Sequence, residues 1–136
     1  MQQLTTVARF GLLIFFLVFA IPKFLSHELS VFIFTQLDVE PWGRYLTGLI
    51  EIIIAVLLLR EATLLFGLLL GLITIVSALI VHFTVIGIVI SNPANTINDE
   101  ASTFISAVTI FVLLVLNLVL NRKGLQKQIE KWFVKA

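Results

Sequence analysis

A single carboxylate, Glu51, stands inside the apolar stretch GLIEIIIAVLLLR at residues 48–60. Three other ionisable residues, Arg9, Lys23 and His82, also fall in or at the end of long apolar runs. An ionisable side chain in a lipid-spanning segment costs about 3 kcal/mol or more unless it is paired or faces a cavity. Each of these residues is therefore a candidate for proton transfer, ligand binding or a structural ion pair.

Helical geometry groups these residues on shared faces, because each residue turns an α-helix by about 100°. Three faces result, one in each of the first three apolar runs: Arg9 with Lys23, Arg44 with Gly48 and Glu51, and Gly67 and Gly71 with His82. Small residues on such faces let membrane helices approach closely. We therefore expect the three faces to point toward one another inside a helix bundle.

Glu51 and His82 are expected at a similar depth. With a rise of about 1.5 Å per residue, Glu51 lies about 10 Å inward of Arg44 and His82 about 12 Å inward of Ile90. Lys23 is long enough to reach the same level. A pocket is therefore predicted in the outer half of the bundle, with Glu51 and His82 handling protons and Arg44 at its mouth. The predicted ligand-binding residues are Lys23, Arg44, Gly48, Glu51 and His82.

Structural roles are the alternatives for these residues. Glu51 is equally suited to an ion pair with Lys23 or Arg44 that holds two helices together. His82 shares the face of the glycines, which favours a packed histidine bonded to a neighbouring helix. The pattern alone does not choose between these roles and proton transfer.

Four further residues are predicted to be structural. Arg9 is near the inner surface, where it is expected to pair with Asn117 or to extend to the lipid head groups. Gly67 and Gly71 form the GxxxG pattern, which predicts close helix packing and, in a scaffold protein, an oligomer interface.

Four apolar runs hold these residues, and each is long enough to cross a hydrocarbon layer, which takes roughly 17–25 residues. They occur at about residues 4–22, 43–59, 62–90 and 102–120, in a chain of 136 residues of which 60% are hydrophobic and 12% charged. Backbone groups in lipid must be satisfied within their own segment, so each run is expected to be a helix. The sequence predicts an all-α membrane protein, with an antiparallel bundle of four transmembrane helices as one domain over residues 1–121.

Basic residues indicate the orientation, because cytoplasmic flanks accumulate Lys and Arg. Residues 122–136 hold five of them, whereas the connection at residues 91–101 holds none. Both termini are therefore expected in the cytoplasm. Residues 122–136 also place Leu125, Ile129, Trp132 and Phe133 at helical spacing, which predicts an amphipathic interfacial tail that binds anionic lipids. The first connection is apolar around residues 30–34, which predicts a short outer helix, and the third is expected to be a polar loop broken at Pro93.

The absent residue types restrict the chemistry of the chain. It has no cysteine and two histidines, so thiolate chemistry is excluded and neither a metal site nor an intrinsic cofactor is expected. Electron transfer would need a partner or a bound cofactor. A net charge of +1 gives no reason to expect nucleic-acid binding.

The first two apolar runs resemble a known family. Arg9, the segment Ala20-Ile-Pro-Lys23-Phe24 and the segment Gly48-Leu-Ile-Glu51 are similar to motifs of the DoxX family of small four-helix bacterial membrane proteins. The family pattern has glycine where this chain has Ala20, and Pro22, just before Lys23, is unusual for the family. Some members are membrane subunits of a thiosulfate:quinone oxidoreductase, and others are associated with thiol and oxidative-stress systems. The resemblance implies a bacterial cytoplasmic membrane protein.

Three functions follow as hypotheses. The first is a membrane subunit of a quinone- or thiol-linked redox system, which is not catalytic alone and works with a soluble redox partner. Its pocket would bind a quinone, with Glu51 handling a proton. The second is non-enzymatic binding or transport of a lipid or other small hydrophobic molecule. The third is a homo-oligomeric membrane scaffold, in which the polar residues only lock the helices together.

Overall fold

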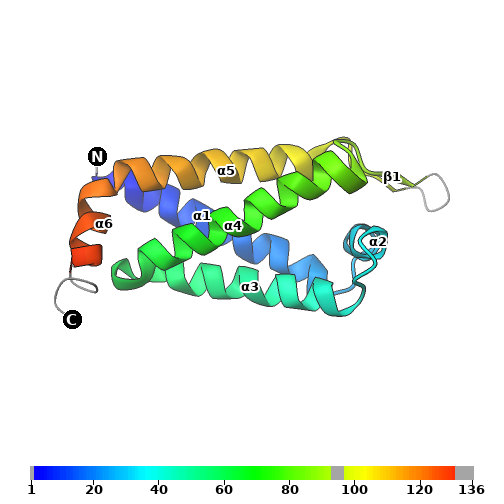
Figure 1. The fold of residues 1–136 in the computed structure, drawn as a ribbon, viewed down its shortest axis with the longest axis horizontal. Helices are drawn as coiled ribbons and strands as arrows, with labels where there is room; N and C mark the ends of the chain where they lie inside the picture. The colour runs from blue at the N-terminus through cyan, green and yellow to red at the C-terminus, as the bar shows by residue number, and fades with distance from the viewer. Residues whose placement is uncertain (1, 93–96, 131–136) are drawn as a thin grey trace.

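Four long helices dominate the computed structural model, which describes residues 2–92 and 97–130. They are α1 (Gln2–Phe24), α3 (Trp42–Leu59), α4 (Leu64–Val81) and α5 (Ser102–Leu120). Successive long helices run in opposite senses along the long axis of the molecule (Figure 1). Helix α1 packs against α3 and α5, and α4 packs against the same two helices.

Short elements close the two ends of this arrangement. Helix α2 (Glu28–Gln36) and a two-stranded antiparallel hairpin, β1 (Ser91–Asn92) with β2 (Ile97–Asn98), lie at one end. Helix α6 (Arg122–Ile129) crosses the other end, beside the first residues of α1 (Figure 1). The turn η1 (Glu61–Thr63) joins α3 to α4 at that same end. The helix expected in the first connection is thus present as α2, and its position relative to a membrane stays a prediction.

Among the described residues, four helices are long and apolar enough to cross a membrane: Gln3–Phe24, Trp42–Leu59, Glu61–Ile86 and Ser102–Leu120. Large apolar side chains remain exposed along their outer faces, as at Ile14, Ile73 and Ile105. A water-soluble protein rarely exposes so much contiguous apolar surface. The chain therefore has the character of a multi-pass membrane protein, while the cytoplasmic placement of the termini stays a prediction.

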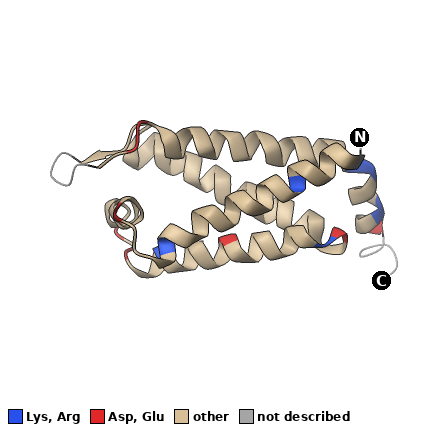
Figure 2. Cartoon of the chain, turned by 180° about the vertical axis from the view of Figure 1, so that it is seen from behind, with Lys and Arg blue, Asp and Glu red and all other residues tan. Residues whose placement is uncertain are grey.

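The core lies between the four long helices and consists of interlocking aliphatic and aromatic side chains. Its most completely buried members are Leu12, Phe16, Ile54, Leu58, Leu68, Ile110 and Leu114. Most charged residues lie near the ends of the long helices and in α6 (Figure 2), which is the distribution that lipid solvation requires. Glu51 departs from it, because it is buried within α3.

The third apolar run does not stay helical to its end. After α4 the helix widens into a π-helical turn, η2 (His82–Ile86), and stops at Gly87, whose φ of 78° belongs to the left-handed region. Only glycine adopts this conformation freely. Residues 87–90 therefore leave the helix axis and lead into the hairpin.

The described part of the tail, α6, fits the amphipathic pattern in part, because Ile129 on its predicted apolar face is 43% exposed. Leu125 is buried, while Arg122, Lys123 and Lys127 are exposed. Trp132 and Phe133, which were predicted to extend the apolar face of the tail, lie outside the described residues. So does Pro93, which was predicted to interrupt the third connection. The interfacial position of the tail stays a prediction.

Candidate functional site

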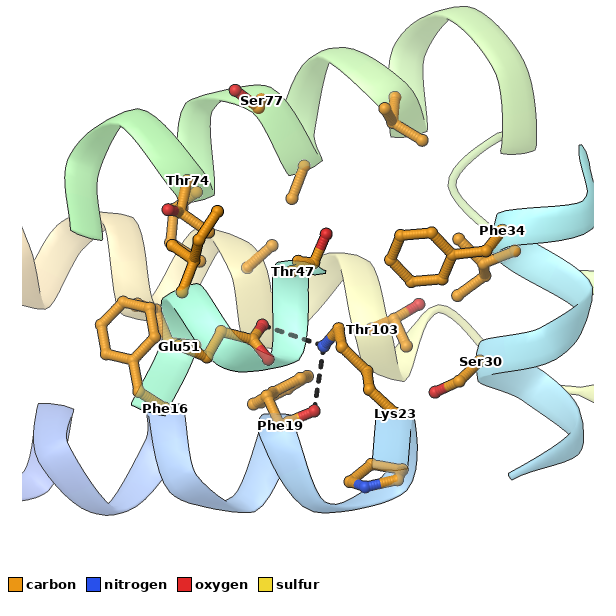
Figure 3. A pocket seen from close by; sticks show the side chains of 18 of the residues that line it. Phe16, Phe19, Lys23, Ser30, Phe34, Thr47, Glu51, Thr74, Ser77 and Thr103 are labelled. Carbon is orange, nitrogen blue, oxygen red and sulfur yellow. Dashed lines mark hydrogen bonds and ion pairs between the residues drawn. The ribbon is translucent and has the colours of Figure 1, made fainter. Parts of the chain in front are cut away.

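The close approach of α1 and α3 forms the centre of the candidate site. Gly48 makes this approach feasible, because a Cβ atom at its position would lie 2.8 Å from Cε2 of Phe24 and 3.3 Å from Cβ of Lys23. At this contact Nζ of Lys23 lies 2.9 Å from Oε1 of Glu51. Nζ also donates a hydrogen bond of 2.9 Å to the carbonyl oxygen of Phe19 (Figure 3). The ion pair therefore joins the end of α1 to the middle of α3.

The two oxygens of Glu51 have different surroundings. Oε1 accepts from Lys23, whereas Oε2 is buried and has no hydrogen-bond partner among the described residues. The side chains of Lys23 and Glu51 are only 12% and 8% exposed. A buried polar atom without a partner costs about 1–3 kcal/mol. Oε2 is thus an acceptor that a ligand donor would satisfy.

A cavity of about 690 Å³ lies beside this ion pair. Residues of α1, α2, α3, α4 and α5 line it, and most of them are apolar, among them Phe16, Ile33, Phe34 and Ile110 (Figure 3). Sites for small molecules in proteins have volumes of roughly 300–1,000 Å³ and combine an apolar lining with a few polar groups. This cavity has both properties.

Three hydroxyl groups in the cavity lining already use their protons. Thr47, Thr74 and Ser77 donate to the carbonyl oxygens of Gly43, Leu70 and Ile73, each one helical turn back, over 2.8–2.9 Å. Their oxygens can still accept hydrogen bonds. Lys23 also lines the cavity, and its ammonium group supplies a cationic donor there.

His82 lines the same cavity and is buried. Its Nδ1 lies 2.8 Å from the carbonyl oxygen of Gly87, and its ring meets Phe104 edge-on at 5.5 Å between centroids. Because a carbonyl only accepts, Nδ1 carries the proton in this contact and neutral His82 keeps Nε2 as an acceptor. In the described part of the chain His82 shares the cavity with Glu51 without a bond to it.

Arg44 and Gly48, both predicted to bind the ligand, are not among the residues that line the cavity. Arg44 is buried, and its Nε lies 2.9 and 3.0 Å from the two carboxylate oxygens of Glu40. A terminal nitrogen donates to the carbonyl oxygen of Lys23, one of the last carbonyls of α1, which have no partner within their own helix. Arg44 therefore ties the end of α1 to the start of α3 and does not pair with Glu51. Glu40 was not among the predicted residues, although its i,i+4 spacing to Arg44 is a recognisable signal.

The predicted structural residues have separate roles. Asn117 is fully buried and donates to the carbonyl oxygen of Leu113 over 3.0 Å, while Asn121 donates to the carbonyl oxygen of Asn117. Arg9 lies over the ring of Phe10, at 5.4 Å from its centroid. No bond joins Arg9 to Asn117 among the described residues, so the pairing expected between them is not formed.

The two glycines of the GxxxG pattern pack inside one chain. A Cβ atom on Gly67 would lie 3.1 Å from Leu57, and one on Gly71 would lie 3.1 Å from both Leu114 and Phe16. This face of α4 is covered by α1, α3 and α5. An oligomer therefore needs a different surface from the one the sequence predicted.

Asp99 is a second polar centre that the sequence analysis missed. Its carboxylate accepts from the N–H groups of Ile90, Ala101 and Thr103 over 2.7, 3.1 and 3.3 Å, and from the hydroxyl of Thr103. Burial raises the pKa of Asp99, but these hydrogen bonds outweigh burial and hold the pKa below its ordinary value. Asp99 thus fastens the hairpin to the start of α5. An acidic residue just before a helix is the available signal.

The part of the chain that the structure describes contains no group of three or more His, Cys, Asp or Glu side chains arranged to hold a metal ion. No protein-family model matches the chain, and no curated protein or solved structure is detectably similar to it. The resemblance to the DoxX family therefore rests on the residues quoted above and stays a prediction.

Proposed function

We propose that this chain binds a quinone in the central cavity as the membrane subunit of a redox system of DoxX type. The observation that carries the proposal is Glu51, a residue in the lining of a largely apolar cavity, whose buried Oε2 has no hydrogen-bond partner in the described part of the chain. A ligand that fits this cavity combines an apolar body with a polar head.

The hydrogen-bonding groups of the cavity suit a quinone. Nζ of Lys23 has three N–H donors and uses two of them, on Phe19 and Glu51, which leaves one for a quinone carbonyl oxygen. The reduced form carries hydroxyl groups instead, for which Oε2 of Glu51 is an acceptor. One ion pair would therefore recognise both forms of the ligand.

The chemistry of each side chain determines its role in the proposed reaction. Reduction of a bound quinone consumes two electrons and two protons, and in this proposal the electrons come from a partner subunit. Glu51 passes a proton at Oε2, while Lys23 stabilises negative charge on the ligand oxygen nearest Nζ. Neutral His82, with Nε2 as an acceptor, is the second candidate to carry a proton through the cavity.

The test is a binding measurement with a short-chain quinone and its quinol on the detergent-solubilised full chain. Glu51→Gln keeps the size of the side chain and removes its charge, so we expect about tenfold weaker quinol binding. Glu100→Gln is the matched control, because Glu100 is exposed in the loop before α5. Unchanged affinity of Glu51→Gln for both forms would rule out the proposal.

A non-redox ligand is the second candidate function. Val18 and Ile73 line the cavity and are 54% and 65% exposed, so the cavity reaches the outer surface of the helices. A lipid-like molecule could enter from the bilayer by this route, with its polar head at Lys23 and Glu51. Native mass spectrometry of protein extracted gently from its own membrane distinguishes a bound quinone from a bound lipid, because it identifies the retained molecule by mass.

A further inference from the structure

A second cavity lies at the opposite end of the long helices, beside α6. Its volume is about 350 Å³, and its lining is formed by α1, the η1 turn, the first residue of α4, and α6 with the residue before it. Unlike the central cavity, it is lined mostly by residues of polar type, among them Thr6, Arg9, Glu61, Asn121, Lys127 and Gln128.

Helix α6 is held in place over this cavity. Leu125 is 6% exposed and belongs to the core, and Nε2 of Gln128 donates to the carbonyl oxygen of Glu61. These two contacts fasten α6 to the bundle and to the η1 turn. The cavity is therefore enclosed by packed elements on several sides.

Two buried polar atoms at this cavity have no hydrogen-bond partner among the described residues. They are Nε of Arg9, a donor, and Oε1 of Gln128, an acceptor. Buried polar groups are nearly always hydrogen-bonded in folded proteins. A ligand that satisfies both must carry an acceptor for the guanidinium and a donor for the amide oxygen.

The charges of the lining residues and the position of the cavity along the helices narrow the class of ligand further. Arg9 and Lys127 are basic and Glu61 is acidic, so the site combines two cations with one carboxylate. The apolar spans that border the cavity begin at Gln3 and Glu61 and end at Leu120. Lipid phosphates lie at the level where such spans meet water. Arg binds phosphate oxygens through several N–H donors at once.

We propose that this cavity binds the head group of a single phospholipid. The phosphate pairs with Arg9 and Lys127, and a terminal hydroxyl or ammonium group donates to Oε1 of Gln128 and to Glu61. Phosphatidylglycerol and phosphatidylethanolamine carry such donors, whereas the choline group of phosphatidylcholine has none. This site is separate from the quinone cavity and does not depend on it.

The test is native mass spectrometry of the full chain, stripped of lipid in detergent and incubated with equal amounts of these three lipids bearing identical acyl chains. We expect one phosphatidylglycerol or phosphatidylethanolamine to be retained in preference to phosphatidylcholine. Arg9→Gln should lower this retention about tenfold, because it removes a charged hydrogen bond. Lys123→Gln is the matched control, since Lys123 is exposed on α6 and is not among the residues that line the cavity.

Circular dichroism and size-exclusion chromatography show whether the variants fold. Should Arg9→Gln not fold, Lys127→Gln takes its place, with the same loss of retention expected. The proposal is overturned by equal retention of phosphatidylcholine, or by an equal loss in Lys123→Gln, which would show only attraction to a basic surface. It is also overturned if millimolar inorganic phosphate displaces the lipid, because the site would then hold free phosphate.

Discussion

Nζ of Lys23 in α1 lies 2.9 Å from Oε1 of Glu51 in α3, while the carbonyl oxygen of the same lysine accepts a hydrogen bond from Arg44. Lys23 is therefore held at both its side chain and its backbone by a single neighbouring helix. This arrangement leaves Oε2 of Glu51 as the unsatisfied atom of the pair. Variants of Lys23 and Glu51 distinguish whether this ion pair stabilises the fold, binds the ligand or does both.

Removing the charge at only one member of the ion pair should destabilise the protein. Lys23→Met leaves a buried carboxylate without its cation, for which we expect a loss of about 3–5 kcal/mol in the free energy of unfolding. The double variant Lys23→Met/Glu51→Leu should recover most of that loss, because neither charge remains to be desolvated. Thermal unfolding in detergent measures the loss in the single variant and its recovery in the double variant.

Ligand binding distinguishes the two roles of the pair. The double variant should be stable and still fail to bind quinone, because it lacks the ammonium donor of Lys23 and the carboxylate acceptor of Glu51. A stable double variant with the affinity of the wild type would show that the pair is only a helix lock.

Arg44 should be irreplaceable by lysine. Its guanidinium bonds to both oxygens of Glu40 and to the carbonyl oxygen of Lys23, and a single ammonium cannot reproduce that planar geometry. We expect Arg44→Lys to lower the free energy of unfolding by about 1–3 kcal/mol, the cost of a buried group left without its partner. Arg122→Lys, on an exposed residue of α6, is the control and should change little. Equal stability of the two variants would contradict the role given to Arg44.

Gly71 and Gly11 should respond differently to alanine. A Cβ atom at Gly71 would lie 3.1 Å from Leu114 and Phe16, whereas one at Gly11 would have nothing within 4 Å. Gly11→Ala should therefore stabilise its helix by roughly 0.5–1 kcal/mol. Gly71→Ala should gain less or destabilise, because Leu114 and Phe16 must move apart.

The larger substitution Gly71→Leu separates packing from oligomerisation. The Gly71→Leu protein should unfold at a lower temperature than the wild type. Its oligomeric state, measured by light scattering, should not change. A changed oligomeric state with unchanged stability would restore the interface that the GxxxG pattern predicted.

The contribution of Asp99 should depend on pH. Hydrogen bonds favour its charged form in the folded chain and hold its pKa below the ordinary value. The stabilisation is therefore complete above the unfolded pKa of about 3.9 and disappears as the pH falls through the lower folded pKa. The melting temperatures of wild type and Asp99→Asn should differ most near neutral pH and converge in acid. Glu100→Gln should show no such convergence, and a constant difference for Asp99→Asn down to about pH 3 would contradict the assignment.

The orientation of the chain can be tested because the sequence contains no cysteine. Single cysteines in place of the exposed residues Asn98 and Lys123 would report on opposite ends of the long helices. A membrane-impermeant maleimide applied to intact cells should label position 98 and spare position 123, since basic flanks stay in the cytoplasm. The reverse labelling would invert the predicted topology.

The four apolar helices could be predicted because lipid leaves the backbone few ways to satisfy its own hydrogen bonds. Helical periodicity likewise placed Lys23, Glu51 and His82 near one cavity, and the structure brings all three to its lining. Periodicity did not reveal that His82 would bond to Gly87. That contact depends on the backbone leaving the helix at Gly87, a glycine with positive φ that lies before the end of the apolar run at Ile90.

The sequence by itself determined the number of long apolar helices and the residues that cannot face lipid, because these follow from the cost of moving polar groups out of water. Only the tertiary structure decided which partner Glu51 receives. It pairs with Lys23 and not with Arg44, because the crossing of α1 over α3 at Gly48 sets which side chains come within reach. Rise and rotation along one helix contain no information about that crossing.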